Sequence, residues 1–263
     1  MSTARVSTRR IRPLVSKVPE ITVWFWVVKL LTTAMGEATS DFLVLHVNKY
    51  LAVVLGAIAF GIAFWLQYRA KRYVPYIYWT FVTMVAVFGT MVADAIHIVL
   101  GVSYWASTTA FAILLAAVFT TWYRVERTLD IHSIVTKRRE LFYWAAVLAT
   151  FAMGTACGDM TATTLHLGYF ASGILFIVLF GGPFLLKRWA GMNEVFAFWF
   201  SYVMTRPLGA SFADWLGVEK AYGGLGFGRG AVALATTVCI IVAVGYLTIT
   251  SKDRPNESLV SNL

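Results

Sequence analysis

Eight apolar segments, each about 20 residues long, follow one another along this 263-residue chain. A helix needs about 20 predominantly apolar residues to cross the hydrocarbon core of a bilayer. Only 13% of the residues are charged and 59% are hydrophobic, whereas a soluble domain carries about 25% charged residues. These properties exclude a water-soluble enzyme, a disordered chain and a nucleic-acid-binding protein. They predict an all-α polytopic membrane protein with eight transmembrane helices, at 21–45, 50–68, 75–100, 103–124, 140–160, 166–186, 193–216 and 229–250.

The basic residues predict how the chain is oriented in the membrane. Seventeen of the 22 lysines and arginines lie in the tails and loops on one side, whereas the opposite loops hold Lys49, Lys220 and Arg229. Because positively charged loops stay in the cytoplasm, we expect both termini there. The net charge of +9 is then an orientation signal and not a sign of an anionic partner. The predicted organisation is a basic cytoplasmic tail 1–20, a single transmembrane domain 21–250 and a cytoplasmic tail 251–263.

One spaced pattern recurs in every odd-numbered segment. It reads aromatic residue, Trp, nine residues, Gly, four residues, Asp, and its four copies align without a gap. Each copy opens a predicted two-helix hairpin, and all four enter the membrane in the same direction. Parallel repeats of this kind are arranged around an axis along the membrane normal. The predicted repeats are about 21–70, 74–128, 138–188 and 193–250. Their shared residues are Trp26/Gly36/Asp41, Trp79/Gly89/Asp94, Trp144/Gly154/Asp159 and Trp199/Gly209/Asp214.

Four tandem two-span units with a fixed tryptophan resemble a bacterial family of membrane-anchored proteins that is built from a "repeat of unknown function". The resemblance covers about 20–250 and rests on Trp26, Trp79, Trp144 and Trp199. It implies a multi-pass protein of the bacterial inner (cytoplasmic) membrane. It implies no activity, so the function has to be argued from the residues.

The four repeated aspartates are the leading candidates for an ion-binding or relay site. At 100° per residue, Trp and Asp share one general face of each helix, about 22 Å apart in height. Ionisable residues within spans usually face a bundle interior, and rings of carboxylates line cation pathways. Glu37 lies one turn before Asp41 and belongs to the same face. The sequence therefore predicts transport or binding of a cation, either a divalent metal or a proton, at Asp41, Asp94, Asp159, Asp214 and Glu37.

Three histidines bear on the identity of this cation. His46, His97 and His166 follow the aspartates closely and are candidate additional metal ligands. Carboxylate with imidazole suits Zn²⁺ or Mn²⁺, and methionines on the same segments leave Cu open. Lys29 and Arg206, which lie within spans, are expected to neutralise part of the acidic charge. The expected cofactor is a divalent metal ion, and the expected partners are the lipid bilayer and a small cation.

The same residues have a second interpretation. Aspartates near helix ends often cap a turn by accepting backbone N–H bonds, tryptophans form aromatic belts at the membrane interface, and glycines permit close helix packing. The protein would then be a non-transporting assembly or sensor module. A membrane enzyme or cofactor binder with an outer acidic cavity is a third alternative. Because phosphate-loop, zinc-protease and serine-hydrolase motifs are absent from the sequence, we expect no enzymatic activity.

Overall fold

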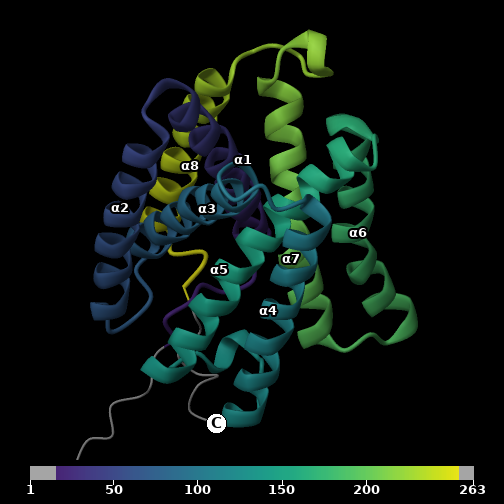
Figure 1. Ribbon diagram of the computed structural model, residues 1–263. Coiled ribbons are helices and arrows are strands. Elements are labelled where there is room, and N and C mark those ends of the chain that lie inside the picture. The colour runs from purple at the N-terminus through teal and green to yellow at the C-terminus, as the bar shows by residue number, and fades with distance from the viewer. Residues whose placement is uncertain (1–15, 255–263) are drawn as a thin grey trace, which may run out of the picture.

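The computed structural model describes residues 16–254, and this part of the chain forms eight long helices and no β-strand (Figure 1). The predicted all-helical fold is confirmed; the predicted tails lie largely outside the described residues. The helices are α1 (Val23–His46), α2 (Lys49–Arg69), α3 (Pro75–Ile98), α4 (Tyr104–Glu126), α5 (Lys137–Asp159), α6 (Gly168–Ala190), α7 (Glu194–Gly217) and α8 (Arg229–Thr250). Three short elements join them: η1 (Ile131–Ser133), η2 (Met160–Thr164) and η3 (Lys220–Tyr222).

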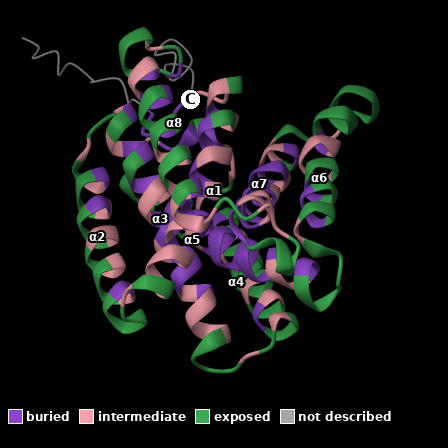
Figure 2. Cartoon of the chain, turned by 90° about the horizontal axis from the view of Figure 1, so that it is seen from above, coloured by how far each residue is buried: buried purple, intermediate pink, exposed green. Residues whose placement is uncertain are grey.

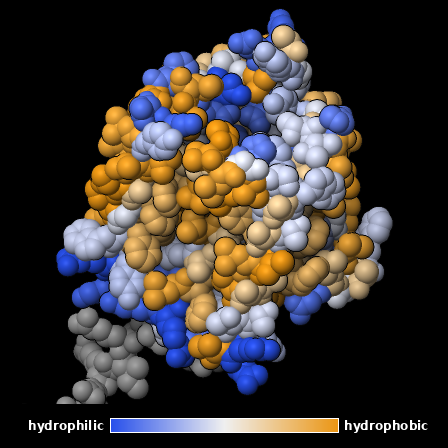
Figure 3. Space-filling model, viewed as in Figure 1, coloured by the Kyte–Doolittle hydropathy of each residue, from blue (hydrophilic) through white to orange (hydrophobic). Residues whose placement is uncertain are grey.

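Six of the described helices are long and apolar enough to cross a membrane: α2, α3, α4, α5 with η2, α6 and α8. The other two, α1 and α7, have 24 residues each but carry the buried charged side chains Lys29, Glu37 and Arg206. Figure 3 shows apolar side chains over much of one face, with hydrophilic residues gathered mainly toward its two ends. These features make the chain a multi-pass membrane protein.

The odd-numbered helices form the interior of the bundle. Each packs against the next, and α7 returns to α1, which closes a ring of four helices. Each even-numbered helix covers the odd-numbered helix that follows it, with α8 returning to α1. Buried residues therefore gather at the centre, whereas α2 and α6 are largely exposed at the periphery (Figure 2). This closed arrangement is the one expected for parallel repeats around a common axis.

The repeat glycines lie where neighbouring odd helices approach closely. A Cβ atom added at Gly36 would lie only 2.8 Å from the backbone carbonyl carbon of Ala86 on α3. The same contact recurs at each step of the ring, and each partner stands three residues before the glycine of its own repeat. Small residues allow such approach in membranes, where packing drives helix association. The four pairs are Gly36 with Ala86, Gly89 with Phe151, Gly154 with Arg206 and Gly209 with Thr33.

The repeat tryptophans lie in the core of the bundle. Trp79, Trp144 and Trp199 are at most 5% exposed, and Trp26 is half-buried. The indole Nε1 of Trp199 donates a hydrogen bond of 2.8 Å to the carbonyl oxygen of Leu129. The interpretation as an aromatic belt is therefore wrong for the three buried tryptophans, because they pack between helices.

The bundle end that holds the repeat tryptophans is called here the tryptophan end, and the opposite end is the aspartate end. The described residues before α1, 16–22, close the tryptophan end. Lys17 forms an ion pair of 2.5 Å with the fully buried carboxylate of Glu140. Gln67 donates to the same carboxylate at 3.1 Å. The backbone N–H of Tyr73 donates to the carbonyl oxygen of Ser16. Buried polar contacts thus tie this segment to α2, α5 and the α2–α3 connection.

The α4–α5 connection carries a pH-dependent contact. His132 lies between Asp130, at 3.0 Å, and Glu20, at 3.4 Å. Its hydrogen bond to Asp130, supported by Glu20, raises the pKa of the imidazole. A group with a raised pKa in the folded state stabilises the protein below its unfolded pKa, near 6.5, and loses this contribution as pH rises through the folded value.

Replacing His132 by Gln is therefore expected to lower the melting temperature at about pH 6 and to leave it unchanged at about pH 8.5. Thermal unfolding of the purified protein in detergent at both values measures the difference. The effect should be small, because the imidazole is about half exposed and its ion pairs are screened by water. An equal loss at both pH values would mean that the imidazole acts by packing and not through its charge.

Candidate cation site

Side chains at four-residue intervals along the odd helices meet near the axis of the ring. Three consecutive layers are buried on all four helices, and the repeat aspartates form the next layer toward the aspartate end. The lowest of the three layers holds Lys29, Val82, Val147 and Tyr202. The middle layer holds Thr33, Ala86, Phe151 and Arg206. The upper layer holds Glu37, Thr90, Thr155 and Ala210.

Arg206 joins all four odd helices. Its fully buried guanidinium donates from Nη2 to Glu37 at 2.5 Å, to Thr155 at 2.7 Å and to the hydroxyl of Thr90. Nη1 donates to the carbonyl oxygen of Thr33 at 3.4 Å. An arginine suits this position because its planar fork offers five N–H donors. Its charge is compensated directly by Glu37, one layer above it.

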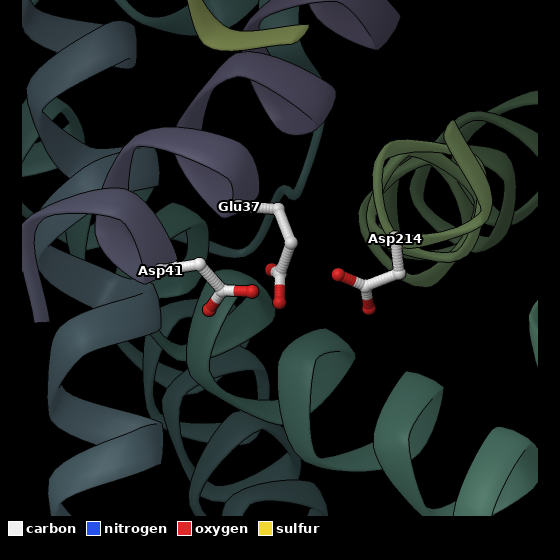
Figure 4. A group of neighbouring side chains, drawn as sticks. All are labelled: Glu37, Asp41 and Asp214. Atoms are coloured by element: carbon white, nitrogen blue, oxygen red, sulfur yellow. The ribbon is translucent and has the colours of Figure 1, made fainter. Parts of the chain in front are cut away.

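Three carboxylates meet beside this ion pair. Glu37, Asp41 and Asp214 each offer one oxygen atom, and these three atoms lie within 4.8 Å of one another. Figure 4 shows Glu37 between Asp41, on the same helix, and Asp214, which reaches in from α7. Arg229, at the start of α8, donates to Asp41 at 2.6 Å. Like charges this close repel one another, so a cation held between the carboxylates would relieve the repulsion.

The other two repeat aspartates contribute to the same negative field from farther away. Asp94 and Asp159 are not members of the close group, but Glu37 interacts electrostatically with all four aspartates. Ser40 donates to Asp94 at 3.4 Å. The five carboxylates face two guanidinium groups, Arg206 and Arg229, which leaves a formal charge of −3. Of the four repeat aspartates, Asp41 and Asp214 thus converge on Glu37, whereas Asp94 and Asp159 lie outside the close group.

The aspartates are not the caps of the following helices. In each hairpin the N-cap of the second helix is a different residue, and none of these is an aspartate. The capping interpretation is therefore wrong for these four helix starts. The N-cap residues are Asn48, Ser103, Leu167 and Gly228.

None of the three histidines belongs to the close carboxylate group. Exposed His46 bonds through Nδ1 to the carbonyl oxygen of Phe42 at 2.9 Å, and His97 bonds to that of Val102 at 2.7 Å. His166 is exposed at a turn, with a φ of 56°. Within residues 16–254 the one group of three or more metal-ligating side chains is the carboxylate group. Its donors are all oxygen, which favours a hard cation such as Mn²⁺, Mg²⁺ or Ca²⁺ over Zn²⁺ or Cu.

Lys29 does not neutralise the acidic group as the sequence predicted. It lies in the layer below Arg206, and its Nζ is 4.0 Å from the ring centroid of Phe151 and 4.1 Å from that of Tyr202. In the part of the chain that the structure describes, Nζ has no hydrogen-bond partner. Arg206 is therefore the base within the odd helices that balances the carboxylates.

Three residues of the site were missed in the sequence. Thr90 and Thr155 directly follow the repeat glycines, at the position that Glu37 occupies in the first repeat. Extending the repeat alignment by one residue beyond the glycine would have found both. Arg229 has no counterpart in the repeat pattern, and only the return of α8 to α1 brings it to Asp41.

Four helical hairpins, closed into a ring around a buried polar axis, define the chain as a multi-pass membrane protein built from internal repeats. The family model described as Repeat of Unknown Function (DUF347) matches it four times in tandem, at 24–73, 77–128, 142–192 and 197–253. The chain belongs to this family, as the resemblance predicted. No curated protein and no solved structure matches the chain.

Proposed function

We propose that this protein binds a divalent cation at Glu37, Asp41 and Asp214 and passes it across the membrane. The observation that carries the proposal is the approach of three carboxylate oxygens to within 4.8 Å of one another at the end of a buried axis. Oxygen donors and an excess of negative charge suit a hard divalent cation. We choose Mn²⁺ as the probe, because carboxylate ligands suit it and its binding is directly measurable.

The proposal includes an orientation in the bacterial inner membrane. All eight helices would span it, including α1 and α7, because their charged residues face the ring interior, where charges within spans are usually found. Most of the basic residues in the described chain lie at the tryptophan end, so by the positive-inside rule this end would face the cytoplasm, with both termini on the same side. The carboxylates would then meet the cation from the outer side.

Arg206 acts as the gate in this proposal. A cation bound to Glu37 competes with the guanidinium for the same carboxylate. Once released, Arg206 would loosen its contacts with Thr90 and Thr155, which tie α7 to α3 and α5. Such a change is needed for passage, because the layers below the carboxylates are filled by buried side chains.

The site is tested by measuring Mn²⁺ binding to the purified protein with titration calorimetry. Glu37→Gln and Asp214→Asn are each expected to weaken binding at least about tenfold, a loss of about 1.4 kcal/mol. Glu194→Gln is the matched control, because this exposed acid lies at the tryptophan end and pairs with Lys187. Equal Mn²⁺ affinity in all four proteins would refute the site.

The test of passage is Mn²⁺ uptake into liposomes that contain the wild-type protein. We expect uptake that Glu37→Gln abolishes. The filled axis is the observation that favours the alternative, a sensor or assembly module that binds the cation without moving it. Binding without uptake would support that alternative and reject transport.

A further inference from the structure

A groove on the outside of the bundle lies between α4 and α7, near the tryptophan end. It measures about 570 Å³ and is lined mainly by apolar and aromatic side chains. Its most buried lining residue is Trp199, which is 5% exposed, whereas Tyr123 on α4 and Phe196 on α7 are more than half exposed. In a chain that spans a membrane, such a surface meets the acyl chains of lipids.

The repeat structure builds this groove twice. Its counterpart, of about 530 Å³, lies between α8 and α3. Each groove is formed mainly by an even-numbered helix and the second odd-numbered helix after it, and the odd helix contributes the same four positions of the repeat pattern. These are Phe196, Trp199, Phe200 and Val203 on α7, and Tyr76, Trp79, Thr80 and Thr83 on α3. Any difference in what the two grooves bind therefore comes from their side chains.

The two grooves differ in charge. Among the described residues, Arg127, directly after α4, is the one charged residue that lines the α4–α7 groove, and none lines the α8–α3 groove. The guanidinium of Arg127 is exposed and has no ion pair or hydrogen-bond acceptor within residues 16–254. The neighbouring carboxylate of Glu126 does not compete for it, because Arg138 and Arg139 hold that carboxylate. The α4–α7 groove thus offers an uncommitted positive charge.

Two neutral side chains that line the same groove have hydrogen-bond donors to spare. The side-chain oxygen of Asn193 accepts from the backbone N–H of Phe196, and that of Thr128 accepts from the backbone N–H of Asp130, both at 3.1 Å. The amide N–H groups of Asn193 and the O–H of Thr128 therefore stay free within the described chain. A guanidinium with such donors beside it suits a phosphate group, whose oxygen atoms accept several hydrogen bonds.

We infer that the α4–α7 groove binds one anionic phospholipid, with its phosphate on Arg127 and an acyl chain along α7 against Trp199. From Phe196 to Val203 the wall of the groove extends about 10 Å along the helix, which accommodates the first part of an acyl chain. Basic pockets between transmembrane helices bind anionic head groups in this way. The lipid joins α4 and α7, which belong to different repeats, and its binding does not depend on the proposed cation site.

The test titrates the full-length protein, purified in a neutral detergent, with phosphatidylglycerol or with phosphatidylcholine. Native mass spectrometry measures the fraction of protein that retains one lipid. The wild type is expected to bind phosphatidylglycerol at least about fivefold more tightly, and Arg127→Gln is expected to lose this preference. Arg72→Gln is the matched control, because Arg72 is exposed at the same end and lines neither groove. Equal affinity of the wild type for both lipids, or an equal loss in both variants, would overturn the inference.

A second pair of variants tests where the acyl chain lies. Val203→Phe narrows the α4–α7 groove and is expected to weaken phosphatidylglycerol binding at least about fivefold, because the acyl chain loses apolar contact there. Thr83→Phe makes the same kind of change in the α8–α3 groove and should bind like the wild type. Equal binding by these two variants would place the lipid elsewhere and reject the groove. If Val203→Phe does not fold, the comparison of Arg127→Gln with Arg72→Gln decides alone.

Discussion

Replacing Arg206 by Met is expected to lower the free energy of unfolding by about 3–5 kcal/mol. The change leaves the buried carboxylate of Glu37 without its counter-charge and removes the donor shared by Thr90 and Thr155. Breaking a buried ion pair from one side is costly because an uncompensated charge stays in the interior. Urea unfolding of the purified protein in detergent, followed by tryptophan fluorescence, measures the loss.

Two further variants separate charge from shape at this position. Combining Arg206→Met with Glu37→Gln removes both charges and is expected to recover much of the lost stability. Arg206→Lys keeps the charge but loses the fork that reaches several helices, so an intermediate loss is expected. If the double variant were as unstable as the sum of the two single variants, the ion pair would not be the source of the effect.

Adding a single methyl group at Gly36 is expected to cost about 1–3 kcal/mol. The new Cβ of Gly36→Ala would lie 2.8 Å from the backbone carbonyl carbon of Ala86, which cannot rotate away as a side chain does. The helices α1 and α3 would have to separate. Because the ring is closed, this displacement would also move Glu37, so Mn²⁺ affinity should fall together with stability.

Gly245→Ala provides the matched control for this prediction. Gly245 lies within α8, and a Cβ there meets no atom within 4 Å. Because alanine has a higher helix propensity than glycine, this replacement is expected to increase the free energy of unfolding by at most about 1 kcal/mol. Urea unfolding of both variants makes the comparison. Similar losses at the two glycines would refute close packing at the repeat positions.

The helices themselves were predictable, and the site was predictable in part. A backbone in a bilayer must satisfy its own hydrogen bonds, so each long apolar segment has to be a helix. The repeat pattern likewise identified Asp41 and Asp214, and helical spacing added Glu37. The sequence pattern did not identify Thr90 and Thr155, because an uncharged threonine is common within a membrane span and does not by itself indicate a site. It failed for Arg229 because no periodicity relates the start of α8 to α1.

The sequence by itself determined that the chain is a membrane protein of four parallel helical hairpins, and which face of each odd helix carries the repeated Trp and Asp. Those properties follow from hydropathy and helical period, which act within one segment. Only the tertiary structure decided that Glu37, Asp41 and Asp214 come together, and that Arg206 and not Lys29 forms the ion pair with Glu37. Distances between side chains on different helices depend on how closely the helices approach at the glycines and on where the ring closes. A local sequence pattern predicts neither of these.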